Sequence, residues 1–187
     1  MRKEKKCRKV RRIRSRFEAK TKCDLRKLEK EIKKSKKEKV LLSNIQIINF
    51  LKCCPNFIGC YPEDKLPSLI TSFPCFLIVN TDNSSMKGSH WLAIGIFKDR
   101  IEIFDPLGFE ILNWPRIPCN LLSFLHKFSQ TRVIYLSKRI QSNNSVLCGY
   151  YCINYIVFRQ ISSWKKIQNF FDNNTSKNDS LLIKFFK

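Results

Sequence analysis

The chain has 187 residues, of which 43% are apolar, and its 36 Lys or Arg against 15 Asp or Glu give a formal net charge of +21. This length and apolar content suffice for one domain with its own core. The N-terminus lacks the apolar stretch of a secretory signal, and no apolar run approaches the roughly 20 residues of a membrane helix. We therefore expect an intracellular protein whose nine cysteines are free thiols.

Residues 1–39 form a basic arm, which holds 20 Lys or Arg against 6 Asp or Glu. Within it Leu25, Leu28 and Ile32 recur at helical spacing, which predicts a weak amphipathic helix with a narrow apolar stripe. Phe17 is its single aromatic residue, so the arm suits contacts with phosphates better than the reading of bases. A solvated, disordered tail or a nuclear-import signal is the alternative.

A domain is expected over residues 40–170, followed by a polar linker and a short basic and apolar segment over 171–187. Periodicity and turn residues predict helices over 41–54, 115–128 and 148–160, strands over 74–80, 90–97, 100–105 and 132–137, a loop over 60–67 and a linker over 172–180. Ser43 is the expected N-cap of the first helix, and Pro55 ends it. The element order predicts an α+β fold with a mixed or antiparallel central sheet flanked by helices.

The strands over 90–97 and 100–105 flank a short turn at Lys98 and Asp99, so we expect an antiparallel hairpin. His90 and Asp105 then lie at the same end of this hairpin. A carboxylate beside an imidazole can orient the ring and stabilise its cation. The only other histidine, His126, lies inside a predicted helix without an acidic neighbour in sequence, which favours a structural or surface role.

Cys148 opens a nearly uninterrupted apolar helix, where the positive helix end favours a thiolate and a backbone N–H can face an oxyanion. Gln141, seven residues earlier, can supply a second donor, and Gly149 leaves room for a substrate backbone. Taken singly, Cys148 is better explained as a core cysteine and Gln141 as a surface amide. The ordered set of His90, Asp105, Gln141 and Cys148 instead indicates a cysteine peptidase.

A metal site is not predicted. Cys53, Cys54 and Cys60 lack the paired spacing of zinc ligands, and a thiol peptidase needs no cofactor for its chemistry.

Three segments resemble the adenovirus protease, or adenain, family and, more distantly, the SUMO-specific proteases of the same clan. They are GSHWLAI (88–94), IFDPLGF (103–109) and QSNNSVLCGYYC (141–152). The resemblance spans roughly residues 41–160. It implies a papain-like core in permuted order, with the catalytic cysteine at a helix N-terminus.

The resemblance also implies a role for each matching residue. These roles are His90 as base, Asp105 as orienting acid, Gln141 in the oxyanion hole, Cys148 as nucleophile and Trp91 as a wall of a narrow channel for glycine-containing substrates, in which Gly149 lets the substrate backbone come close. Two positions depart from the adenoviral pattern, because those enzymes usually carry Glu at Asp105 and a peptide-linking cysteine at Gln130. Activation by DNA or by a viral peptide is therefore left open.

The predicted function is that of a monomeric thiol endopeptidase. It would process viral or virus-like capsid or core precursors at glycine-containing sites while the basic arm binds nucleic acid. The expected location is the host nucleus or a cytoplasmic replication site, and the virion. Alternatives are a SUMO- or ubiquitin-like isopeptidase, an acyltransferase using the same cysteine, and a non-enzymatic nucleic-acid-binding core protein.

Overall fold

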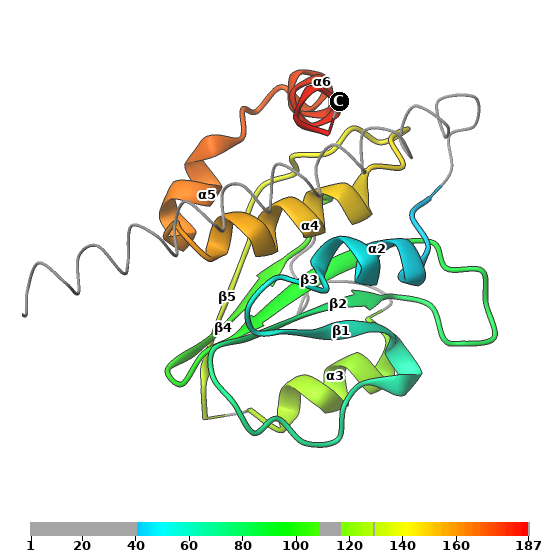
Figure 1. The fold of residues 1–187 in the computed structure, drawn as a ribbon, viewed down its shortest axis with the longest axis vertical. Helices are drawn as coiled ribbons and strands as arrows, with labels where there is room; N and C mark the ends of the chain where they lie inside the picture. Colours follow the sequence, from blue (N-terminus) through cyan, green and yellow to red (C-terminus); the bar gives the residue numbers. More distant parts are fainter. Residues whose placement is uncertain (1–40, 109–116, 129, 187) are drawn as a thin grey trace, which may run out of the picture. The chain divides into compact units, whose positions relative to one another are not determined.

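The computed structural model describes residues 41–108, 117–128 and 130–186, and its central feature is a five-stranded mixed sheet (Figure 1). The strands are β1 (Phe57–Pro62), β2 (Cys75–Asn80), β3 (Trp91–Ile96), β4 (Arg100–Phe104) and β5 (Arg132–Tyr135). They lie in chain order, with β1 parallel to β2, β2 and β3 antiparallel, β3 and β4 antiparallel, and β4 parallel to β5. The predicted fold class, α+β with a mixed sheet flanked by helices, is confirmed.

The helices are α2 (Asn44–Leu51), α3 (Cys119–His126), α4 (Cys148–Arg159), α5 (Trp164–Phe170) and α6 (Thr175–Phe185), with a 3-10 turn, η1, at Glu63–Lys65. Helices α3 and α4 lie on opposite sides of the sheet (Figure 1). Ser43 caps α2 as predicted, and a reciprocal bond from Gln46 completes a capping box. Val40–Leu182 form one compact unit, to which the following description applies.

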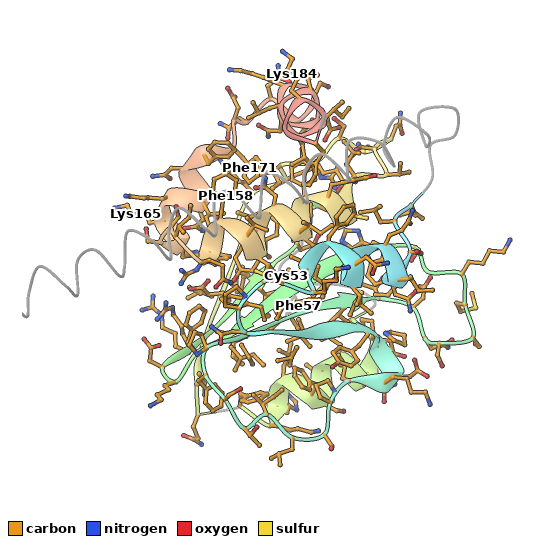
Figure 2. The ribbon with its side chains drawn as sticks, viewed as in Figure 1. Cys53, Phe57, Phe158, Lys165, Phe171 and Lys184 are labelled. Atoms are coloured by element: carbon orange, nitrogen blue, oxygen red, sulfur yellow. The ribbon has the colours of Figure 1, made fainter. Side chains whose placement is uncertain are left out.

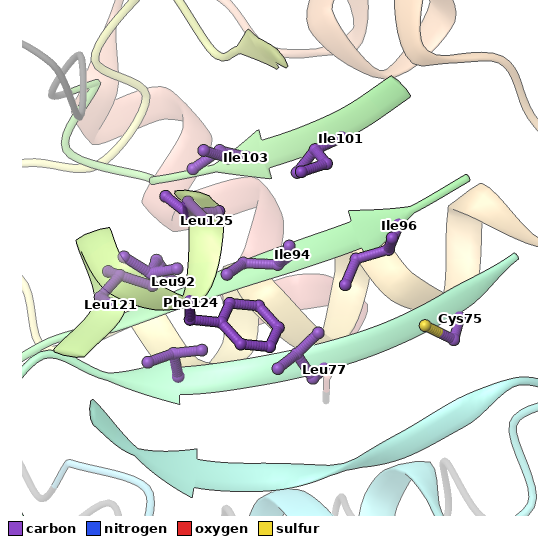
Figure 3. Close-up of a cluster of buried hydrophobic side chains, with 11 residues drawn as sticks. Cys75, Leu77, Leu92, Ile94, Ile96, Ile101, Ile103, Leu121, Phe124 and Leu125 are labelled. Atoms are coloured by element: carbon purple, nitrogen blue, oxygen red, sulfur yellow. The ribbon is translucent and has the colours of Figure 1, made fainter. Parts of the chain in front are cut away.

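The core beneath α3 follows from the alternation of side chains along the central strands. Every second residue of β2, β3 and β4 faces this helix, and Figure 3 shows these side chains around Phe124. The cluster comprises Cys75, Leu77, Val79, Leu92, Ile94, Ile96, Ile101, Ile103, Leu121, Phe124 and Leu125, all buried. This core holds the β3–β4 hairpin rigid from the side opposite α4.

The other face of the sheet meets α4 through a buried charged network. Glu102 is fully buried and accepts bonds from Arg159 at 2.7 and 2.9 Å, from Arg100 at 3.0 Å and from the Tyr155 hydroxyl at 2.9 Å. Both guanidinium groups also lie over the Phe97 ring, at 4.2 and 4.8 Å from its centroid. A buried carboxylate with this many donors is compensated, so β4 and α4 are joined by paired charges.

Several predicted boundaries differ from the structure. The segment predicted as a loop over 60–67 contains the end of β1, which pairs in parallel with β2, an interaction between residues that are distant in sequence. Strands and helices elsewhere are shorter by a few residues, and positions 115 and 116 of the predicted third helix lie outside the described residues.

The predicted linker over 172–180 is wrong, because α6 begins at Thr175 inside it. The side chain of Asn174 accepts the Lys177 N–H at 3.1 Å, which caps the helix start, and Asn178 is 1% exposed. The polar residues that made this segment look like a linker include the helix cap, Asn174, and a buried hydrogen-bonding side chain, Asn178.

Helix α5 packs against α4 through aromatic side chains. Phe158 of α4 lies 5.5 Å from Phe170 between ring centroids, and Figure 2 shows Phe158 and Phe171 in this region. No described helix combines the length and apolar character that crossing a bilayer requires. The weak helix predicted around Leu25 lies outside the described residues, and the predicted division at residues 40 and 170 stays a prediction.

Candidate active site

The β3–β4 hairpin brings His90 and Asp105 together as predicted. Ala93 pairs with Phe104 and Ile96 with Ile101, so the residues that precede β3 and follow β4 share one end of the sheet. His90 Nε2 donates to Asp105 Oδ1 at 2.7 Å, and both side chains are buried, Asp105 with 1% exposed. The bond fixes Nε2 as the protonated nitrogen and leaves Nδ1 for another partner.

A tight turn, Asp-Pro-Leu-Gly, orients the carboxylate. Asp105 Oδ1 also accepts the Leu107 N–H at 2.8 Å, and the Asp105 carbonyl accepts the Gly108 N–H at 2.9 Å. Gly108 has a φ of +70°, and a Cβ there would lie 2.4 Å from the Arg139 nitrogen, so the turn requires glycine. The carboxylate is therefore held by backbone that cannot easily shift.

Cys148 is the first residue of α4 and is 2% exposed. Its side chain hydrogen-bonds with His90, so the three groups form a continuous series of thiol, imidazole and carboxylate. Burial alone would lower the pKa of His90, but the hydrogen bonds and charges of Asp105 and Cys148 outweigh it and raise the pKa to about 9. The ring is thus protonated at neutral pH and can serve as a proton donor.

Gln141 lies on the loop between β5 and α4, and it is 2% exposed. The Pro106 carbonyl accepts the backbone N–H groups of both Ile140 and Gln141, at 2.9 and 3.0 Å, so this loop is joined directly to the Asp105 turn. The side-chain Nε2 donates to the Ser145 carbonyl at 2.7 Å. This bond identifies the amide nitrogen and uses one of its two hydrogens, so one donor is left.

Trp91 and Gly149 pack together beside the first turn of α4. The Trp91 indole N–H donates to the Leu42 carbonyl at 2.9 Å in a buried bond. A Cβ at Gly149 would lie 3.2 Å from the Leu42 side chain and 3.4 Å from Trp91 Cδ1. The small size of Gly149 thus lets Leu42 and Trp91 approach the first turn of α4, a packing role that the sequence did not indicate.

The structure brings His90, Asp105 and Cys148 into one hydrogen-bonded series and joins Gln141 to it through Pro106. Sequence reasoning missed the contributions of Leu42 and of the Pro106 and Ser145 carbonyls. A backbone carbonyl is present at every residue, so these two leave no signal in the sequence. In the sequence, Leu42 cannot be distinguished from an ordinary apolar core residue.

A thiol at a helix N-terminus, an imidazole and a buried carboxylate in this order are the machinery of a cysteine peptidase. The family model described as adenovirus endoprotease matches residues 57–179, about two thirds of the chain, and the chain belongs to this family of cysteine endopeptidases. The resemblance found in the sequence is thereby confirmed.

Among solved structures, a crystal structure of a protease of African swine fever virus is similar to the chain. It has 19% sequence identity and a TM-score of 0.49, and the match covers 80% of this chain and 67% of the viral one. No curated protein matches the chain in sequence.

Proposed function

We propose that Cys148 is the nucleophile, His90 the acid and base, Asp105 the orienting acid and Gln141 an oxyanion donor of a viral endopeptidase. The single observation that carries this assignment is the hydrogen-bonded series from Cys148 through His90 to Asp105 at the N-terminus of α4. Geometry, burial and the raised pKa of His90 agree with a resting thiolate–imidazolium pair.

In the proposed acylation step, the Cys148 thiolate attacks the scissile carbonyl carbon and its oxygen becomes an oxyanion. The Cys148 backbone N–H, which has no partner within the first helical turn, and the remaining Gln141 amide hydrogen stabilise that charge. The His90 imidazolium gives its proton to the leaving amine, which departs as the thioester forms. Asp105 keeps the ring oriented throughout by accepting from Nε2.

In deacylation, the neutral His90 takes a proton from water, and the resulting hydroxide adds to the thioester carbonyl. The second oxyanion collapses and expels the Cys148 thiolate, which leaves the product as a carboxylic acid that gives its proton to solvent as it is released. The imidazolium formed in this step is the resting form again, so no external acid or base is consumed.

The proposed substrates are viral capsid or core precursors cleaved at glycine-containing sites. The support is the sequence resemblance, in which Trp91 matches the wall of a narrow channel for glycine-containing substrates. An isopeptidase acting on ubiquitin-like conjugates would use the same chemistry but needs a docking surface for a folded modifier.

A panel of peptides tests this assignment. Peptides with Gly, Ala or Phe at the cleaved bond, and SUMO and ubiquitin conjugates, are incubated with the protein and with Cys148→Ala. Cleavage of the Gly peptides alone, absent in Cys148→Ala, is expected. Cleavage after Phe but not after Gly would refute the channel, and cleavage of conjugates alone would establish the isopeptidase.

We expect the kcat/KM for peptide cleavage to fall as pH rises through about 9. The reason is that the leaving amine needs the His90 proton, and the pKa of His90 is raised to about 9. Asp105→Asn removes a charge that raises this pKa, so its alkaline limb should move to lower pH. Rates measured from about pH 6 to about pH 10 check both expectations; identical limbs in the two proteins would show that Asp105 does not act on His90.

We further propose that the basic arm holds the protease on nucleic acid, where precursor substrates are concentrated. The support is compositional, since residues 1–39 carry 20 Lys or Arg with a single aromatic residue. Binding of this kind goes to phosphates and is independent of base sequence.

Deleting residues 1–39 is expected to weaken binding to duplex DNA and to flatten its salt dependence. If the arm neutralises about 8 phosphates, log K against log salt has a slope near about −7 in the full chain. Fluorescence anisotropy over a salt series measures the slope. Peptide cleavage without DNA should be unchanged, and an unaltered slope after the deletion would place DNA binding elsewhere.

A further inference from the structure

Helix α6 makes buried contacts with the loop that carries Gln141. The carbonyl of Ile140, the residue directly before Gln141, accepts from Asn178 Nδ2 at 3.0 Å. On the other side of Gln141, the Ser142 hydroxyl lies 3.2 Å from the Thr175 hydroxyl. The first half of α6 therefore binds the chain both immediately before and immediately after the proposed oxyanion donor.

Asn178 is built into this contact with little freedom to move. It is 1% exposed, its Nδ2 donates to the carbonyls of Ile140 and Asp172, and its Oδ1 accepts the Asp172 N–H at 2.9 Å. Rotating the amide would break these bonds and leave buried polar groups unpaired. The Ile140 carbonyl is consequently held in one position relative to α6.

The Ile140 carbonyl also lies close to α4, the helix that begins with Cys148. Tyr151, one turn after Cys148, has its hydroxyl 3.2 Å from the Ile140 carbonyl and 2.7 Å from Asp179 Oδ1. A hydroxyl has one hydrogen, and the closer, charged carboxylate is the better acceptor. Asn178 is therefore the principal donor to Ile140, while Tyr151 and Asp179 fix the separation of α4 and α6.

We propose that Asn178 is a positioning residue, which acts through Ile140 to hold Gln141 at the distance from Cys148 that oxyanion stabilisation requires. Asn178 touches neither the substrate nor the reacting atoms. The inference rests on the proposed role of Gln141 as an oxyanion donor. Losing Asn178 should cost less than losing Gln141 itself, because the donor is displaced rather than removed.

The test is a double-mutant cycle in the full chain. Asn178→Ala is expected to lower kcat about tenfold at nearly unchanged KM, which is less than the 10²–10³-fold loss typical of removing an oxyanion donor. In a Gln141→Ala background the same change should cause no further loss, since the group it positions is gone. Lys177→Ala is the matched control, because this neighbour on α6 makes an exposed ion pair with Asp172 and should leave kcat unaltered.

A second readout separates positioning from general damage. Alkylation of Cys148 by iodoacetamide forms no oxyanion, so its rate should stay unchanged in Asn178→Ala. If Asn178→Ala fails to fold, Tyr151→Phe takes its place. It removes the hydroxyl that bonds Asp179 and lies 3.2 Å from the Ile140 carbonyl, so it loosens the contact of α6 with this loop and should lower kcat about threefold, again only while Gln141 is present.

An equal loss of kcat in both backgrounds, a wild-type kcat in Asn178→Ala, or a parallel fall in alkylation rate would each overturn the inference. A wild-type chain that cleaves no peptide would refute the proposed function instead. Hydrogen–deuterium exchange then judges the inference alone. Backbone amides over 138–143 should exchange faster in Asn178→Ala than in wild type or Lys177→Ala, and equal exchange would refute it.

Discussion

Replacing Cys148 or His90 by Ala is expected to abolish peptide cleavage while leaving the fold intact. In the proposed mechanism the Cys148 thiolate forms the acyl intermediate and the His90 imidazolium protonates the leaving amine, so either loss disables the same unit. Removing one member of such a unit costs roughly 10⁶ in kcat in a serine peptidase. Turnover measured with a Gly-containing peptide, together with the thermal unfolding midpoint of each variant, checks the expectation.

His90→Gln is a useful companion variant. His90→Ala leaves the buried Asp105 with only the Leu107 N–H as a donor to its Oδ1 among the described contacts, whereas the amide of Gln can still donate to it. Both variants should be inactive, and His90→Gln should unfold closer to the wild-type temperature. Activity in His90→Gln would remove His90 from the proposed acid–base role.

Alkylation tests the assignment of Cys148 as the nucleophile without the need for a substrate. An ion-paired thiolate reacts with iodoacetamide at about pH 6, where ordinary thiols, with a pKa near about 8.5, are protonated. Among the described thiols, burial raises the pKa of Cys54 and Cys75 to about 11 and that of Cys60 to about 12, so the competitors in this part of the chain are the exposed Cys53 and Cys119. Peptide mapping should find the label on Cys148. Faster labelling of another cysteine, with turnover retained in Cys148→Ala, would contradict the assignment.

Gln141→Ala is expected to lower kcat by about 10²–10³ with a small effect on KM. In the proposed mechanism the Gln141 amide faces the charge that develops on the carbonyl oxygen, and this charge is absent from the bound substrate, so the loss falls on the transition state. The bond from Nε2 to the Ser145 carbonyl orients the amide before substrate arrives, which is why its removal should be felt fully.

Gln160→Ala is the matched control for this prediction. Gln160 follows the last turn of α4 and also donates its Nε2 to a backbone carbonyl, that of Ile156 at 3.2 Å. It lies at the opposite end of the helix from Cys148. A kcat that falls equally in both variants would trace the effect of Gln141→Ala to lost hydrogen bonding in general and not to the oxyanion.

The parts of the fold that depend on local sequence were predictable. The β3–β4 hairpin has a short turn and alternating apolar residues, so the juxtaposition of His90 and Asp105 followed from counting positions. The parallel pairing of β1 with β2 was not predictable in this way. Its partners are separated by a long connection, and Pro55, Gly59 and Pro62 give the segment the composition of a loop.

The candidate site likewise contains residues that the sequence predicted and supporting groups that it could not predict. His90, Asp105, Gln141 and Cys148 carry distinctive side-chain chemistry, so their residue types and spacing indicated a peptidase. The groups that hold them in place are backbone carbonyls and one asparagine, Asn178, which stands in a polar segment typical of a linker. Its role becomes visible only once α6 is seen to pack beside the loop after β5.

The buried network around Glu102 limits the routes by which this sequence can change over evolutionary time. Replacing Glu102 alone leaves Arg159 without its carboxylate, and replacing Arg159 alone leaves the buried Glu102 with Arg100 as its remaining charged partner. Breaking a buried pair in this way costs up to about 3–5 kcal/mol. That is a large share of the about 5–15 kcal/mol by which an ordinary domain is stable. If one of these two residues is lost while the other stays, the protein becomes less stable, and stability returns only when the second residue changes as well. Relatives should therefore have inherited or discarded the carboxylate of β4 and the guanidinium of α4 together.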